Sequence, residues 1–199
     1  MRTLVIATLL TLLAACAGGP EAPPVQTVGS AGNPVLLVAY TPNETVRVGF
    51  EDQLEADLDA AGISNIPSHN LVSSFDDVDE PSLMRTAIDR NVPMILMVRR
   101  IVTELPGDGQ QVPPGVERHR TLRGYFMAVD RTRLPDVPPP GRQVIEVAGY
   151  LRDGNATELV WSGYSWVDFD GDLGAAIRDT SETIARNLAP ACDEIACRP

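Results

Sequence analysis

The sequence contains no lysine, two histidines and three cysteines among 199 residues. Every positive side chain apart from histidine is therefore an arginine, which excludes a Schiff base or a lysine general base. The few histidines and cysteines, His69 and His119 among them, do not stand at the spacing of a zinc site. The formal net charge of −11 and the lack of a basic patch argue against nucleic acid as a partner, since phosphate contacts dominate that affinity.

The N-terminal segment has the pattern of a cleavable signal over residues 1–15. Arg2 precedes a mostly apolar stretch at positions 4–13, which is shorter than the roughly 20 residues that span a bilayer but fits a signal h-region. The run Leu13-Ala14-Ala15-Cys16 follows directly and resembles the lipobox of bacterial lipoproteins. That resemblance implies that Cys16 carries the lipid. An ordinary secretory signal with a chance cysteine is the alternative.

The rest of the chain divides into a tether, one domain and a short tail. Residues 16–33 are rich in glycine, proline and alanine and predict a flexible, lipidated tether. Residues 34–189 are long enough for one domain with its own core, and residues 190–199 form the tail. Ala17 after the lipidated cysteine resembles an outer-membrane address with the domain facing the periplasm, and the inner membrane is the less favoured alternative.

The two remaining cysteines, Cys192 and Cys197, lie close together near the C-terminus. A periplasmic protein meets an oxidising compartment, so a disulfide between them is predicted. Because the loop is short, the bond would mainly hold a fraying tail. Redox-active thiols and intermolecular bridges are the alternatives.

Apolar periodicity predicts an α/β (α+β) domain: a single mixed sheet of about five or six strands with three helices packed on it. Continuous apolar runs at 35–40 and 94–102 indicate buried strands, and 143–152 with 158–167 indicate a hairpin. The first helix is expected to start with Thr41 as cap and Pro42 at its first position. Its stripe is Val46, Phe50, Leu54 and Leu58, with the acidic residues, Glu51 among them, mostly on the other side.

Three further elements are expected along the chain. A second helix runs to about Arg90, with Leu83, Ala87 and Ile88 facing inward. A strand is expected within 121–130, between loops rich in proline and glycine at 106–118 and 131–142. A last helix is expected from about Leu173 to Leu188, ended by Pro190.

The segments VLLVAY, FEDQLEADLDAAGI, MILMVRRIV and LVWSGYSW together resemble a set of uncharacterised envelope lipoproteins. These carry a small α/β domain like that of the activators of penicillin-binding proteins and the N-terminal domain of the Tol-system propeller protein. The resemblance covers roughly residues 34–189 and rests on core patterns, so it brings no catalytic residues. It implies an accessory or binding role on a periplasmic complex.

An acidic loop before the last helix is a candidate calcium site. Asp168, Asp170 and Asp172 alternate, and Asp179 stands at the twelfth place, where a calcium loop needs its closing ligand. The glycine of such a loop is misplaced here, and aspartate is shorter than the usual glutamate. The simpler interpretation is that Asp170 or Asp172 caps the last helix.

Three aromatic residues of one predicted strand are candidate contacts for a partner. Trp161 is expected on one face, and Tyr164 and Trp166 on the other. Burial under helices is the simpler interpretation, and an exposed patch for a partner or a glycan is the alternative.

These patterns favour a non-enzymatic accessory lipoprotein that binds an envelope protein, with no cofactor. A module for a small ligand or a peptidoglycan fragment is the second hypothesis. A hydrolase is the third and least favoured hypothesis, because no serine lies on a strand-to-helix elbow and no histidine has a recognisable catalytic setting.

Overall fold

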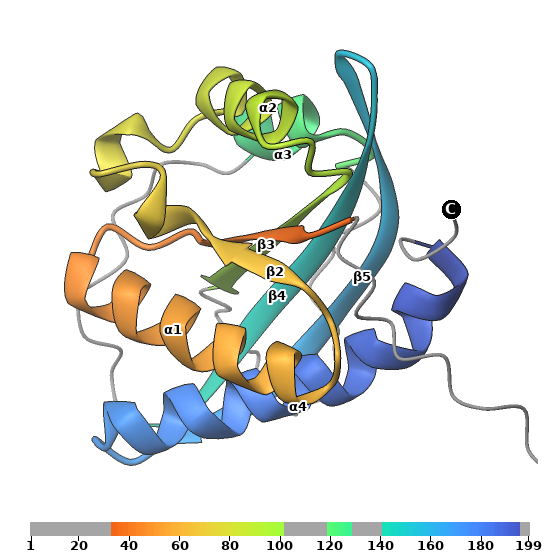
Figure 1. Ribbon diagram of the computed structural model, residues 1–199. Helices are drawn as coiled ribbons and strands as arrows, with labels where there is room; N and C mark the ends of the chain where they lie inside the picture. The colour runs from red at the N-terminus through yellow and green to blue at the C-terminus, as the bar shows by residue number, and fades with distance from the viewer. Residues whose placement is uncertain (1–32, 102–118, 129–140, 196–199) are drawn as a thin grey trace, which may run out of the picture.

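The computed structural model describes residues 33–101, 119–128 and 141–195 (Figure 1). The predicted signal, Cys16, most of its tether, Cys197 and most of the two loops rich in proline and glycine lie outside the described residues. Within those described ranges, no helix is long and apolar enough to cross a membrane.

The described residues form one mixed five-stranded sheet and four α-helices, which confirms the predicted fold class with one helix more than expected. Two short 3-10 helices, η1 (Ser68–Asn70) and η2 (Phe75–Asp77), follow the second strand. The strands are β1 (Val35–Ala39), β2 (Asn65–Pro67), β3 (Met94–Ile101), β4 (Gly141–Asp153) and β5 (Ala156–Phe169). The helices are α1 (Glu44–Ala60), α2 (Glu80–Asp89), α3 (Leu122–Ala128) and α4 (Leu173–Ile195).

The strand order is β2-β1-β3-β4-β5. The first three strands are parallel, β4 and β5 are antiparallel neighbours, and a tight turn at Gly154 joins them as predicted. Gly154 has a φ of +58°, a conformation that glycine adopts without a steric penalty. Because β3 pairs antiparallel with β4, the ends of β1, β3 and β5 and the start of β4 meet at one edge of the sheet.

Helices cover both faces of the sheet. Figure 1 shows α1 and α4 side by side on one face, and α2 with the short α3 on the other. The odd-numbered residues of β1 pack under α1 and α4, and the even-numbered ones under α2 and α3. The buried Ser181 hydroxyl on α4 hydrogen-bonds the Asp57 carboxylate on α1, which adds a polar link to this helix pair. The domain is therefore a three-layer α/β/α arrangement.

Two elements differ from the prediction. The segment expected to be a strand within 121–130 is the helix α3, because Leu122 and Tyr125, three residues apart, are both buried. The Thr121 hydroxyl accepts a hydrogen bond from the N–H of Gly124 and closes its first turn. The last helix does not end at Pro190 but runs through it to Ile195, and the buried Cys192 holds that last stretch against the core.

Smaller details of two helices also differ. Asn43, not Thr41, caps α1, since its side chain accepts from the N–H of Val46 at 3.1 Å. On α2, Ile88 was expected to face inward but is 45% exposed. Met84, one turn earlier, is buried instead. Asp79 caps α2 and places Pro81 in the first turn, where its missing N–H costs nothing.

Candidate functional site

This topology favours a binding site at the C-terminal ends of β1 and β3, the side of the sheet called its carboxyl edge here. Strand β1 lies between β2 and β3. The chain passes from β1 to β2 through α1 on one face of the sheet, and from β2 to β3 through α2 on the other face. In open α/β sheets, ligands bind at the carboxyl ends of the strands where the connections diverge in this way.

A pocket of about 110 Å³ opens at this edge, between the first turns of α1 and the first half of α4. Most of its walls are apolar. They are lined by Ala39, Tyr40, Thr41, Val46, Phe50, Val98, Arg99, Arg100, Gln143, Ile145, Val167, Phe169, Leu173, Ala176, Ile177 and Thr180.

Arg100 and Arg99 are the two charged residues of this lining, and they face opposite sides of the sheet. Arg99 forms an ion pair with the buried Glu146, which lies on the face covered by α2 and α3. Arg100 alternates with Arg99 along β3 and belongs to the face of α1 and α4. Burial lowers the pKa of the Arg100 guanidinium from its ordinary value, but an arginine stays charged at neutral pH.

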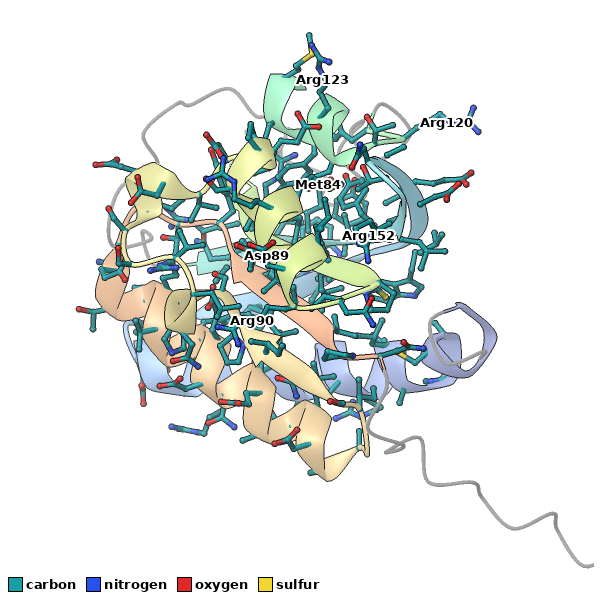
Figure 2. All side chains as sticks on the ribbon, turned by 45° about the horizontal axis from the view of Figure 1, so that its top comes forward. Met84, Asp89, Arg90, Arg120, Arg123 and Arg152 are labelled. Carbon is teal, nitrogen blue, oxygen red and sulfur yellow. The ribbon has the colours of Figure 1, made fainter. Side chains whose placement is uncertain are left out.

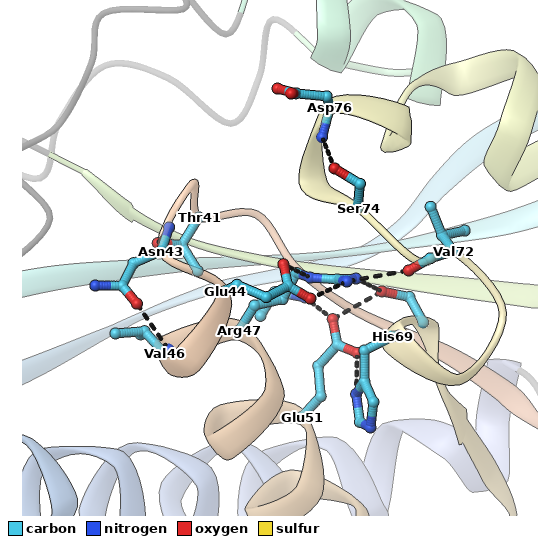
Figure 3. A network of polar contacts seen from close by, with 12 residues as sticks. Thr41, Asn43, Glu44, Val46, Arg47, Glu51, His69, Val72, Ser74 and Asp76 are labelled. Atoms are coloured by element: carbon cyan, nitrogen blue, oxygen red, sulfur yellow. Dashed lines mark hydrogen bonds and ion pairs between the residues drawn. The ribbon is translucent and has the colours of Figure 1, made fainter.

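Figure 3 shows a buried ionic network that includes Arg47 and Glu51 of α1, each the next residue after Val46 and Phe50 of the pocket lining. Arg47 is fully buried, donates to both carboxylate oxygens of Glu44 at 2.9 and 2.6 Å, and reaches the Val72 carbonyl at 3.0 Å. Its third contact is the Ser68 hydroxyl at 3.3 Å. The hydrogen bond from Arg47 lowers the pKa of the Glu44 carboxyl.

Glu51 is the centre of this network. Its fully buried carboxylate accepts from the Ala39 N–H and the Ser68 hydroxyl, both at 2.8 Å, and from the His69 N–H at 2.9 Å. The carboxylate thus connects the end of β1 to the η1 turn. A buried charge is tolerable only with partners of this number and quality.

His69 lies between two carboxylates. Its Nδ1 atom is 2.9 Å from Glu51 and its Nε2 atom is 3.1 Å from the exposed Asp52. The neighbouring Ser68 hydroxyl is fully buried and donates to Glu51. Since both ring nitrogens of His69 face carboxylates, neither is placed to take a proton from Ser68, and this group is not arranged as a nucleophile–base pair.

Sequence reasoning missed this network, because Glu51 was expected on the outer side of α1. A signal was present: Arg47, Glu51, Leu54 and Leu58 have the spacing of a single helix face. Two opposite charges four residues apart, in line with two buried leucines, indicate that both charged side chains are buried rather than solvated.

A second polar cluster lies under α3 on the opposite face. The Arg99 guanidinium lies 5.0 Å from the centre of the Tyr125 ring, a cation–π contact, and pairs with Glu146. His119, the second histidine, is buried, lies edge-on to Tyr125 and accepts a hydrogen bond on its carbonyl from the Tyr150 hydroxyl. Burial raises the pKa of Tyr125 and of Tyr150, and the nearby Arg99 offsets only part of the shift.

The aromatic strand β5 has the predicted alternation. Trp161 packs against the core under α1 and α4, whereas Tyr164 and Trp166 lie on the other face. Tyr164 is half-buried, and Trp166 is 40% exposed, so the prediction that burial accounts for the aromatic residues is wrong for Trp166. Beside it, Asp168 forms an exposed ion pair with Arg142 at 3.3 Å.

The acidic loop caps α4. The Asp172 carboxylate accepts from the N–H of Ala175 at 3.0 Å, and Asp170 accepts from the N–H of Asp172 at 3.0 Å, which confirms the capping interpretation. Across the residues that the structure describes, no three histidine, cysteine, aspartate or glutamate side chains gather to hold a metal ion, Asp168 and Asp179 included.

Several arginines lie on the face of α2 and α3, although the whole chain is acidic; Arg90, Arg120 and Arg123 are exposed, and Arg152 is half-buried. Figure 2 shows Arg90 and Asp89 at the end of α2, Arg120 and Arg123 at α3, and Arg152 near the β4–β5 turn. Asp89 lies among them, so they form a mixed surface and not a continuous basic one.

No family model matches the chain, and no curated protein matches it. Among solved structures, the chain is similar to the PelC dodecamer of Paraburkholderia phytofirmans in two crystal forms. The identities are 17% and 16%, the matches cover 80% of this chain and 88% of that one, and the TM-scores are 0.39 and 0.38. It is also similar to lipoprotein GNA1162 of Neisseria meningitidis, with 14% identity, 77% and 99% coverage and a TM-score of 0.35.

Similarity at this level supports no argument about activity. None of these three structures is named as an activator of penicillin-binding proteins or a Tol protein, so that part of the predicted resemblance stays a prediction.

Proposed function

We propose that this chain is a lipid-anchored envelope protein whose domain binds a partner protein through strand β5 and catalyses no reaction. The observation that carries the proposal is Trp166, a large aromatic side chain that is 40% exposed on an edge strand. Tryptophan is enriched among the residues that dominate binding energy at protein interfaces.

The anchor rests on the sequence. An apolar stretch placed directly before Leu13-Ala14-Ala15-Cys16 is the pattern that directs lipid attachment to the cysteine. The tether that follows would let the domain reach away from the membrane. Ala17 favours the outer membrane, with the domain facing the periplasm.

The edge of the sheet supplies backbone groups for a partner. Strand β5 has a strand neighbour on one side only among the described residues. Near its start, the carbonyl of Arg120 accepts from the N–H of Leu159 and so covers the edge. Further along, from Trp161 to Phe169, no backbone hydrogen bond from another described element reaches that side. An extended segment of a partner could add there as a further strand, with an apolar side chain against Trp166.

A binding role without catalysis is supported by the state of the polar groups. Ser68 and both nitrogens of His69 are engaged with carboxylates, and Glu146 is paired with Arg99. These contacts hold the η1 turn against α1 and strand β3 against β4, so they have a structural role.

The test is crosslinking of the tagged full-length protein in living cells, followed by its recovery from the envelope. We expect one envelope protein to be captured, and Trp166→Ala to reduce its recovery at least tenfold. Ile88→Ala is the matched control, because Ile88 is an equally exposed apolar residue on α2, away from β5.

Two outcomes would contradict the proposal. Equal recovery with Trp166→Ala and Ile88→Ala would show that β5 is not the contact. Absence of any captured protein, together with retention of peptidoglycan fragments on the purified protein, would favour the ligand-binding alternative instead.

A further inference from the structure

Strand β5 has, along its open edge, the features of a strand that pairs with a copy of itself. We propose that the partner bound by β5 is a second copy of this chain. The two copies join antiparallel along the stretch from Trp161 to Phe169, about a two-fold axis at Ser165. This inference rests on the proposed role of β5 as the contact surface and names the partner that this surface takes.

The open edge has the length and the position that such a pairing needs. The backbone hydrogen bond from Leu159 to Arg120 covers the start of β5, and no backbone hydrogen bond from another described element reaches this edge from Trp161 to Phe169. Ser165 is the midpoint of that stretch. An antiparallel pair centred on Ser165 therefore engages the whole stretch of both copies, whereas a centre one residue earlier or later leaves one end of it unpaired.

The same stretch lacks the devices that keep an exposed edge from pairing. Native proteins protect such edges with lysine, proline, bulges or inward-pointing charges. From Trp161 to Phe169 the sequence has neither lysine nor proline, and its single charged residue is Asp168, near the end. The register shift in the pairing of β4 with β5 comes before Trp161, so the stretch itself is regular. An edge of this kind favours the addition of another strand.

The side chains of β5 are complementary to themselves in this register. Residues of a strand alternate between the two faces of the sheet, and the face of α2 and α3 receives Ser162, Tyr164, Trp166 and Asp168. A centre at Ser165 sets Trp166 of each copy opposite Tyr164 of the other. Aromatic pairs directly across a sheet stabilise it, and this pairing forms two of them. The exposed Trp166 side chain of each copy thus gains an aromatic neighbour.

The charges also fit a second copy. Asp168 of each copy lies opposite Ser162 of the other, whose hydroxyl can donate a hydrogen bond to the carboxylate. The two Asp168 residues lie about six residues apart along the pair, or about 20 Å at about 3.4 Å per residue, so they do not repel strongly. Arg142 of β4 already pairs with Asp168 at 3.3 Å, so this charge is balanced within each copy. A pair centred on Trp166 would instead set Tyr164 opposite Asp168.

The test begins with two copies of the full-length protein that carry different tags and are expressed in the same cells. We expect capture of one tag to recover the other, and Trp166→Ala in both copies to reduce that recovery at least tenfold. Ser162→Asp sets a carboxylate opposite Asp168 of the other copy and should reduce recovery at least threefold, while Ser162→Arg should keep or raise it. Because Ser162 is exposed, neither substitution alters the core.

Cysteines placed across the proposed pair test its register. The Cβ atoms of directly opposite residues lie about 5 Å apart, close enough for a disulfide. Ser162→Cys in one copy and Asp168→Cys in the other should therefore give, after mild oxidation of isolated membranes, a covalent dimer that carries both tags. Ser162→Cys in both copies is the control, because those two positions lie about 20 Å apart in the pair. The parent chain measures any background from Cys192 and Cys197.

The outcomes separate this inference from the proposed role of β5. Capture of a different envelope protein through Trp166, with no recovery of the second tag, would overturn the second copy as partner and leave β5 as the contact surface. Absence of both captures would overturn both. Equal covalent dimer from the Ser162→Cys control, or equal recovery with Ser162→Asp and Ser162→Arg, would overturn the antiparallel pair centred on Ser165 and the inference with it.

Discussion

At the scale of single residues, two buried tyrosines under α3 are held differently. The Tyr150 hydroxyl donates to the carbonyl of His119 at 3.2 Å, whereas the buried Tyr125 hydroxyl has no hydrogen-bond partner among the described residues. The two rings are edge-on neighbours with centres 6.0 Å apart, and the Tyr125 ring additionally makes the cation–π contact with Arg99. A buried hydroxyl without a partner costs free energy that a satisfied one does not.

Tyr125→Phe and Tyr150→Phe should therefore differ in their effect at neutral pH. Tyr150→Phe leaves a buried carbonyl without its donor and should lower the free energy of unfolding by about 1–2 kcal/mol. Tyr125→Phe removes only an unpaired hydroxyl and should leave that free energy unchanged or slightly higher. Urea unfolding at pH 7 measures both, and an equal loss in the two variants would contradict the assignment.

The same pair predicts how stability depends on alkaline pH. Burial raises the pKa of both tyrosines above the ordinary value of about 10, so the folded state keeps protons that the unfolded state releases. Their contribution is fully present below about pH 10 and is lost as the pH rises from there toward the raised pKa of the folded state. Unfolding measured from pH 9 to 12 should show a fall in stability that is shallower in each phenylalanine variant than in the parent.

Glu51 is the residue on which the network around α1 most depends. Glu51→Gln removes the charge that faces His69 and two other donors, and should cost about 3 kcal/mol of unfolding free energy. Glu55→Gln, one turn further along α1 and without those contacts, should cost less than about 0.5 kcal/mol. Similar losses in the two variants, measured by urea unfolding, would show that the buried carboxylate is not a central element of the fold.

At the scale of elements, apolar periodicity predicted the buried strands and the hairpin because each is a long run of one pattern. It failed at α3, a seven-residue helix in which Tyr125, Phe126 and Met127 read equally well as a strand. It also failed at Pro190, where tertiary contacts at Leu188 and Cys192 keep the helix going past a residue that normally ends one.

The candidate site was harder to predict for a physical reason. The pocket is lined by residues from six helices and strands, and no short sequence motif predicts that they come together. The network around Glu51 likewise needs the η1 turn to fold against α1. The exposure of Trp166 depends on which elements pack over that part of β5, and the periodicity of the strand does not specify this.

The first turn of α4 gives a prediction about its cap. Asp172→Ala removes the acceptor for the Ala175 N–H and should lower the unfolding free energy by about 1 kcal/mol, while Asp172→Asn, which keeps an acceptor, should cost less. Thermal unfolding measures both. Because capping accounts for this carboxylate, micromolar calcium should leave the melting temperature unchanged, and a rise of several degrees would show that the loop binds the ion after all.

At the scale of the whole molecule, the described residues form one α/β domain, and the proposed lipid anchor, Cys16, precedes it in the sequence. Cys16→Ser should release the protein from the membrane fraction and abolish incorporation of labelled lipid, since serine lacks the thiol that carries the diacylglycerol. Fractionation of cells that express each form measures this. A serine variant that stayed in the membrane fraction would rule out lipid anchoring at this cysteine.

The central claim is that β5 is the surface that meets a partner. A photoreactive amino acid placed at Ser162, exposed on β5 on the same face as Trp166, tests it most directly, with the same residue at the exposed Ala56 on α1 as control. Illumination of intact cells should give one discrete crosslinked envelope protein from position 162 and none from position 56. The same crosslinked protein from both positions, or none from position 162, would contradict the claim.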